Sequence, residues 1–130
     1  MKRSIRTAAA LLLLLGTLTA TLTAAQAVEP RFTGISMLTS TLNISTTGKA
    51  SCSGTVTLKS GYTADLTVEL QKDGSTIKTW TDSGSGILSA GGDYYVPTGH
   101  DYVVVTTATV YDKNSVEVES PSATSPEKSY

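Results

Sequence analysis

The sequence has one cysteine, Cys52, and one histidine, His100, among its 130 residues. A single cysteine cannot form an intramolecular disulfide, so the fold must be held together by its apolar core. One histidine and one cysteine on different segments do not make the clustered ligand set of a transition-metal site. No acidic stretch has the spaced oxygen ligands of a calcium loop either. We therefore expect no metal and no cofactor.

The sequence also lacks an excess of either charge, with ten basic and eleven acidic residues. The lysines are dispersed along the chain, and the last residues, "ESPSATSPEKSY", are polar rather than apolar. Binding of nucleic acid or anionic lipid needs a basic patch or stripe, which this distribution does not provide. We expect no nucleic-acid partner.

One long apolar run is present, and it lies at the start of the chain in "MKRSIRTAAALLLLLGTLTATLTAAQA". Three cations precede the run, and the small-residue triplet Ala25-Gln26-Ala27 follows it, which predicts a cleaved secretory signal peptide over residues 1–27. The alternative is a membrane anchor, but Gly16 and four threonines interrupt the ~20 apolar residues that a spanning helix needs. We expect a secreted, extracellular protein without a membrane span after cleavage. Loss of three basic residues leaves seven against eleven acidic ones, a net charge of −4.

The rest of the chain alternates apolar and polar residues in short segments, without a sustained helical period. The clearest segments are "KASCSGTVTL" at 49–58 and "ADLTVELQ" at 64–71, each typical of a strand with one buried and one wet face. Asp73-Gly74 predicts a tight turn, and the Gly91-Gly92 pair predicts a loop. We predict an all-β domain over residues 28–120, followed by a polar C-terminal tail over 121–130.

The stretch "GHDYVVV" at 99–105 and the placement of Cys52 give the chain a family resemblance. In immunoglobulin-like domains, a tyrosine at the start of the sixth strand makes a corner hydrogen bond, and a cysteine two residues later pairs with one on the second strand. Here Tyr102 matches the tyrosine and Val104 stands in place of the second cysteine. The chain thus resembles an immunoglobulin-like or fibronectin type III-like antiparallel sandwich of about seven strands. The resemblance implies that Cys52 is a buried, reduced thiol near Val104, and it leaves the two strand orders open.

The same segments are similar to short secreted proteins of uncharacterised function from Gram-positive, Firmicute-type bacteria. The motifs that carry this likeness are "GKASCSG", "LTVELQ", "GHDYVV" and "VYD". They imply a bacterial host and a sandwich fold, and they imply no activity.

Catalytic motifs are sparse. A general base must be positioned against a nucleophile or a metal, and the only histidine lies in a Gly-His-Asp turn. The Gly-x-Ser-x-Gly elbow of serine hydrolases is missing. We expect no enzyme. The alternative is a small secreted enzyme that uses His100 and Asp101 on an unknown substrate.

The predicted sixth strand offers a candidate binding surface. If Tyr102 faces the core, the alternation turns the next residue and every second one after it outward. This outer strip would contain Val103, Val105, Thr107, Thr109 and Tyr111. Apolar side chains on the outside of a central strand often mark an interface.

Two aromatic residues, Trp80 and Tyr95, could extend this strip, because exposed aromatic rings stack on sugar rings or partner proteins. Packing in the core is the alternative for such large side chains. We therefore expect a non-enzymatic protein with a binding or structural role and a protein or glycan partner. An inert, self-associating surface component is a third hypothesis.

Overall fold

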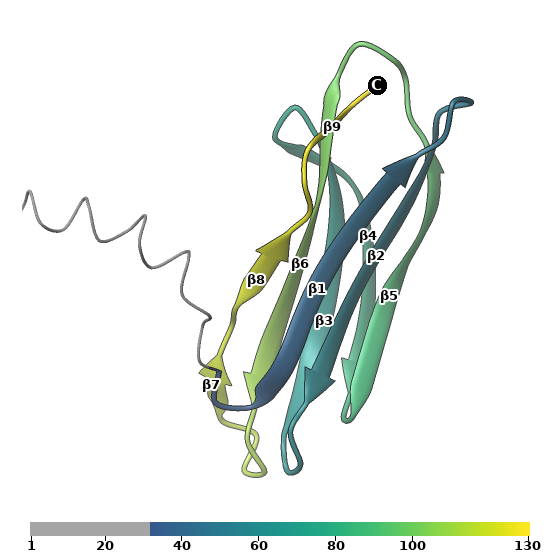
Figure 1. Ribbon diagram of the computed structural model, residues 1–130. Coiled ribbons are helices and arrows are strands. Elements are labelled where there is room, and N and C mark those ends of the chain that lie inside the picture. Colours follow the sequence, from purple (N-terminus) through teal and green to yellow (C-terminus); the bar gives the residue numbers. More distant parts are fainter. Residues whose placement is uncertain (1–31) are drawn as a thin grey trace, which may run out of the picture. The chain divides into compact units, whose positions relative to one another are not determined.

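The computed structural model describes residues 32–130, and the predicted signal peptide at 1–27 lies outside this range. The described chain is all-β, with nine strands in two antiparallel sheets that pack face to face (Figure 1). This confirms the predicted sandwich. No helix long and apolar enough to cross a membrane occurs within residues 32–130.

The first sheet has three long strands in the order β1-β2-β5. They are β1 (Ile35–Ile44), β2 (Lys49–Leu58) and β5 (Ile87–Tyr95). Along β2 every second side chain is buried, as its alternating sequence predicts.

Strand β5 runs through Gly91 and Gly92, so the loop predicted for this pair is wrong. Gly92 pairs with Cys52 on β2, and Gly91 pairs with Ser53. Both positions need glycine for lack of space. A Cβ at Gly91, whose φ is 144°, would collide with the Cys52 carbonyl oxygen, and a Cβ at Gly92 would lie 2.8 Å from the Trp80 indole nitrogen. The glycines therefore permit close packing within a strand instead of a turn.

The second sheet is built around β6 (Asp101–Tyr111), the longest strand. One side of β6 pairs with β3 (Thr63–Lys72), which in turn pairs with the edge strand β4 (Ser75–Gly84). Asp73-Gly74 forms the predicted turn between β3 and β4, with positive φ at both residues.

Three short strands pair in succession with the other side of β6. They are β7 (Glu117–Glu119), β8 (Ser122–Thr124) and β9 (Lys128–Ser129). The sheet therefore continues past residue 120, and the polar tail predicted for 121–130 is part of the domain. Its polar composition suits an edge that faces water, and its prolines lie between the short strands.

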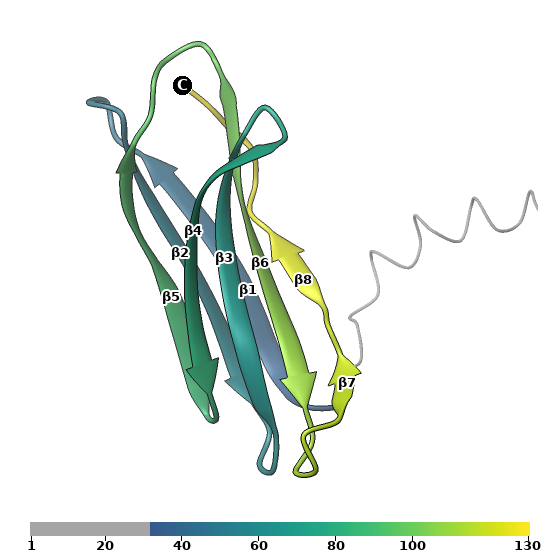
Figure 2. The same cartoon turned by 180° about the vertical axis from the view of Figure 1, so that it is seen from behind.

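The position of β4 differs from that of the fourth strand in constant-type immunoglobulin domains. In constant-type immunoglobulin domains the fourth strand lies beside the fifth. Here β4 pairs with β3, in the sheet that also contains β6. Viewed from behind, β4 and β5 lie at the same side of the sandwich (Figure 2).

The core lies between the sheets and is almost entirely apolar. Its buried apolar residues are Ile35, Leu42, Ala50, Cys52, Val56, Leu58, Ala64, Leu66, Val68, Leu70, Leu88, Val96, Tyr102, Val104, Ala108 and Val110. Cys52 is a free thiol in the same buried cluster as Val104. The sandwich thus has a small hydrophobic residue at each of the two positions that immunoglobulin domains join by a disulfide.

One buried polar contact joins the two sheets. The fully buried Thr106 on β6 donates its hydroxyl to the Ser40 hydroxyl on β1 at 3.0 Å. Ser40 in turn donates to the Val104 carbonyl oxygen at 2.7 Å. Gly54 on β2 lies directly against Thr106, because a Cβ there would overlap the threonine side chain and approach Val68 Cγ2 to 2.6 Å.

The first strand is held at its beginning by the opposite sheet. Both carboxylate oxygens of Glu119 on β7 accept backbone hydrogen bonds, from Thr33 N–H at 2.9 Å and from Gly34 N–H at 2.7 Å. Hydrogen bonds to a charged acceptor are among the stronger ones in proteins. These bonds join Glu119 to Thr33 and Gly34, which lie 86 and 85 positions before it in the sequence.

We predict that Gly54→Ala lowers the free energy of unfolding by about 1–3 kcal/mol, because the added methyl group overpacks the space beside Thr106. Urea denaturation of the variant measures the change. Ser53→Ala, on the exposed face of the same strand, is the control and should stay within about 0.5 kcal/mol of the parent protein. Equal stability of the two variants would contradict this account of the sheet contact.

The corner hydrogen bond predicted for Tyr102 is present. Its hydroxyl donates to the Pro97 carbonyl oxygen at 2.5 Å, while the rest of the side chain is fully buried. The bond ties the loop before β6 to the core.

We predict that Tyr102→Phe destabilises the protein by about 1 kcal/mol, since it removes the bond and leaves the Pro97 carbonyl without this donor. Chemical denaturation should show a lower midpoint with an unchanged slope. Tyr95→Phe is the matched control, because Tyr95 is 68% exposed and should lose nothing. A midpoint for Tyr102→Phe equal to that of the control would argue against a stabilising corner.

Candidate binding surfaces

The strip predicted on β6 faces away from the core, as expected. Val103 and Val105 are half-buried on the outer face of the second sheet. Their neighbours across the strands are polar: Gln71 lies opposite Val103, and Glu69 opposite Val105. The apolar area is therefore narrow, with an acidic residue beside it.

Tyr111 lies further along the same face and is held by an acidic neighbour. Its hydroxyl donates to Asp65 Oδ2 at 3.3 Å. Desolvation, followed by the charges of Asp65 and Glu117, raises the pKa of Tyr111. The phenol stays protonated and able to donate a hydrogen bond over the physiological pH range.

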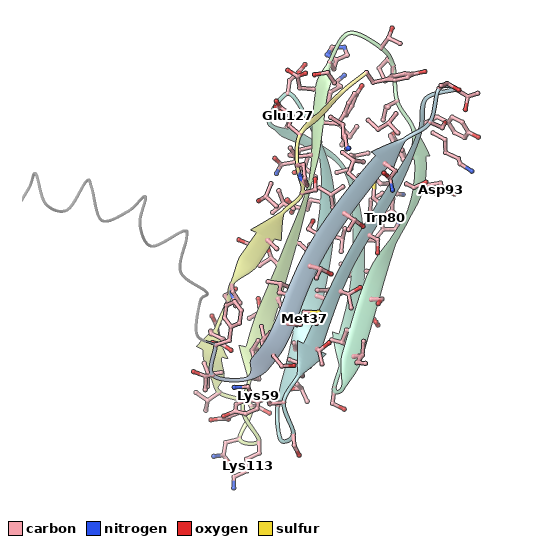
Figure 3. All side chains as sticks on the ribbon, in the orientation of Figure 1. Met37, Lys59, Trp80, Asp93, Lys113 and Glu127 are labelled. Atoms are coloured by element: carbon pink, nitrogen blue, oxygen red, sulfur yellow. The ribbon has the colours of Figure 1, made fainter. Side chains whose placement is uncertain are left out.

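Trp80 does not join this strip. It lies opposite the buried Val68, so its ring faces inward, where it is half-buried against the core (Figure 3). The indole lies against Gly92 of β5 and thereby packs β4 against β5. The core-packing alternative fits this placement.

Tyr95 lies on a different surface, the outer face of the first sheet, because it alternates with the buried Leu88 side of β5. The five residues predicted to bind a partner therefore do not form one site. Val103, Val105 and Tyr111 share one outer face, Tyr95 belongs to the other, and Trp80 lies between the sheets.

The outer face of the first sheet is a second candidate surface, which the sequence analysis missed. Across β1, β2 and β5 its side chains align in rows that carry mostly hydroxyl groups. The rows are Thr39–Thr55–Ser89, Thr41–Ser53–Gly91 and Asn43–Ser51–Asp93. The alternating serines and threonines of β2 were visible in the sequence. Their alignment with Ser89 and Asp93 depends on β5, a strand that could not be recognised in the sequence because Gly91 and Gly92 resemble a loop.

The charged residues of this face form one linked group at its end. Lys49 Nζ lies 3.8 Å from Asp93 Oδ2, and the Ser51 hydroxyl donates to Asp93 Oδ1 at 3.0 Å. Both members of the ion pair are well exposed, so the pair contributes little to stability. The opposite charges of Lys49 and Asp93 compensate each other, so this pair adds no net charge to the surface.

A shallow hollow opens in the middle of this face, next to Gly91. Its volume is about 270 Å³, and it is lined by Cys52, Ser53, Ser89, Ala90 and Gly91. No side chain covers the backbone at Gly91, because a Cβ there would collide with the Cys52 carbonyl oxygen. The exposed Ser53 and Ser89 border the hollow.

The candidate catalytic pair is arranged differently from the prediction. His100 Nδ1 contacts Asp73 Oδ2 at 2.6 Å, and Asp101 does not take this role. The Asp101 carboxylate instead accepts a hydrogen bond from the Ser129 hydroxyl at 2.5 Å. Asp73 also accepts the Asp101 N–H, and these two bonds, the backbone one first, lower the pKa of Asp73. The cluster joins the β3–β4 turn to the start of β6.

Within the part of the chain that the structure describes, no three His, Cys, Asp or Glu side chains come close enough to hold a metal ion. His100 makes no hydrogen bond to a hydroxyl nucleophile among residues 32–130.

The Cys52 thiol is a weak nucleophile at neutral pH. Burial, and to a lesser degree the charge of Asp93, raises the pKa of Cys52 to about 11. The thiolate, which is the nucleophilic form, is therefore scarce at neutral pH.

We predict that Cys52 in the native protein reacts with a thiol reagent such as Ellman's reagent far more slowly than an exposed cysteine at pH 8. The reaction should accelerate as the pH approaches 11 or when denaturant is added. The control is the double variant Cys52→Ala, Ser53→Cys, which places a thiol on the exposed side of the same strand. Equal rates for the two thiols would show that Cys52 is accessible.

The sequence matches no protein-family model and no curated protein. The fold is that of a two-sheet antiparallel sandwich, consistent with an immunoglobulin-like or fibronectin type III-like domain.

Proposed function

We propose that the protein is secreted and non-enzymatic, and that it acts by binding a partner at or outside the cell surface. The observation that carries this proposal is the location of its reactive and its exposed groups. Cys52 is buried with a raised pKa, and His100 is paired with Asp73 in a contact that joins a turn to a strand. The outer faces of the two sheets, in contrast, present ordered rows of side chains to solvent.

A rigid sheet face suits binding, because its side chains are held in register before a partner arrives. Little side-chain ordering then has to accompany association. The described sandwich has two such faces with different character. The second sheet presents the valine strip with Glu69 and Asp65 beside it, and the first sheet presents hydroxyls.

Secretion is supported by the tripartite pattern of residues 1–27. The side chains of His100 and Asp101 contact other residues, Asp73 and Ser129 respectively.

We predict saturable retention of the protein on Gram-positive cell walls or on mucin, with the retaining material recovered unchanged. Co-sedimentation with increasing protein concentration measures the retention, and chromatography of the supernatant detects any released product. Val105→Lys should abolish retention if the second sheet carries the contact, and Tyr95→Ala should do so if the first sheet does. These positions are half-buried and exposed, so both variants should fold.

Three results would contradict the proposal. One is the lack of saturable retention on either material. Another is the appearance of a cleaved product, which would favour an enzyme. The third is retention that neither face variant changes.

A further inference from the structure

We propose that a neutral glycan chain binds along β5 on the outer face of the first sheet, between Tyr95 and the hollow at Gly91. This inference rests on the proposed binding function and names its surface and ligand class. Four features of the described residues carry it: an exposed aromatic ring, cancelled charges, a bare hollow and a row of hydroxyl groups.

Tyr95 supplies the aromatic ring. Its side chain is 68% exposed at the end of β5, opposite Lys49 on β2. An exposed aromatic face offers the apolar C–H surface of a sugar ring a large and rigid contact. The phenol hydroxyl remains available as a donor and an acceptor.

The charges of this face point to a neutral ligand. Among the outward residues of β1, β2 and β5, the charged side chains are Lys49 and Asp93, which lie 3.8 Å apart and compensate each other (Asp93 is labelled in Figure 3). A polyanionic glycan would find no net positive field here. The Asp93 carboxylate keeps acceptor capacity beyond its bond to Ser51, and sugar hydroxyls are suitable donors to it.

The hollow provides a place where a ring can approach the backbone. It lies at Gly91, two residues from Asp93 and four from Tyr95 on the same side of the strand. Ser53 borders it, and its hydroxyl makes no hydrogen bond to other side chains or backbone of residues 32–130. Ser89, on the other side, shares a hydrogen bond with Thr55 at 3.1 Å. Each hydroxyl can both donate and accept, as the hydroxyls of a sugar do.

The spacing favours a chain of sugars over a single one. Four residues along a strand place Tyr95 and Gly91 roughly 13 Å apart. A ligand that contacts both must therefore be an oligosaccharide or a polysaccharide that runs parallel to β5.

The composition of this face argues against a protein partner. The cores of protein–protein interfaces are enriched in aromatic residues, methionine and arginine, and they are depleted in serine. The centre of this face consists of Thr41, Ser53, Ser89 and Gly91, with the exposed Ile87 and Met37 only at its far end. Hydroxyl groups of this density suit a ligand that is itself rich in hydroxyls.

Isothermal titration calorimetry with the protein expressed from the full chain tests the proposal. The probes are the neutral hexasaccharides of chitin, cellulose and xylan, with a galacturonate hexamer as the anionic probe. We expect at least one neutral chain to bind, with an affinity that does not change between low and high salt. The anionic chain should bind more weakly than the neutral one.

The variants locate the site. Tyr95→Ala should weaken binding of the neutral chain about tenfold through loss of the ring contact, while Tyr95→Phe should keep most of the affinity. Ser53→Val, which fills the hollow and removes the hydroxyl, should also weaken it. Tyr111→Ala on the opposite face and Ile87→Ala at the far end of the same face are controls and should leave the affinity unchanged.

The proposal is overturned if no neutral chain binds, if the anionic chain binds more tightly, or if Tyr111→Ala lowers the affinity while Tyr95→Ala does not. The failure of this site differs from the failure of the proposed function. Retention on cell walls or mucin that Val105→Lys abolishes would preserve the function and move it to the second sheet. The loss of both glycan binding and retention would overturn the two together.

Discussion

The close approach of the two sheets around Thr106 is the constraint on which the sandwich depends. Immunoglobulin domains join their sheets with a disulfide at the positions that Cys52 and Val104 occupy here, two residues before Gly54 and Thr106, and this chain cannot form that bond. Here Gly54 removes a side chain from one sheet so that Thr106 of the other can enter, and Ser40 satisfies its hydroxyl. Burial of a polar group is costly without such a partner. The inner residues of β2, β3 and β6 belong to one buried cluster around this contact.

Much of this fold could be predicted from alternation alone. β2 and β3 have one apolar and one polar face, and β6 alternates buried and outward side chains over eleven residues. The tyrosine corner was predictable because it depends on a short local pattern, a tyrosine at the start of a strand and a carbonyl five residues before it. Local rules of this kind need no knowledge of distant segments.

The errors arose where a distant segment decides the local structure. Gly91 and Gly92 resemble a loop in isolation, but Cys52 and Trp80 occupy the space that their side chains would need. Residues 121–130 resemble a free tail because nothing in their own composition shows that β6 offers them a hydrogen-bonding edge. His100 pairs with Asp73, 27 residues away, because the β3–β4 turn brings that carboxylate to the start of β6.

The candidate surfaces also combine features set by the local sequence pattern with features set by distant segments. The outward direction of Val103 and Val105 was a matter of alternation, whereas their polar neighbours came from the pairing with β3. The hydroxyl face of the first sheet is a product of register, since its rows combine residues from three strands. A shift of one residue in β5 would turn Tyr95, Asp93 and Ser89 toward the core.

The carboxylate of Glu119, which holds the backbone of Thr33 and Gly34, has a consequence for the order in which the chain folds. The beginning of β1 acquires this contact only after nearly the whole domain has been synthesised. Pairings between such distant segments lose much chain entropy before they gain stability, and sandwiches dominated by them fold in milliseconds to seconds. A chain of this kind remains open while its last strands are missing. That delay is compatible with the proposed export, in which the chain would cross a membrane before it folds.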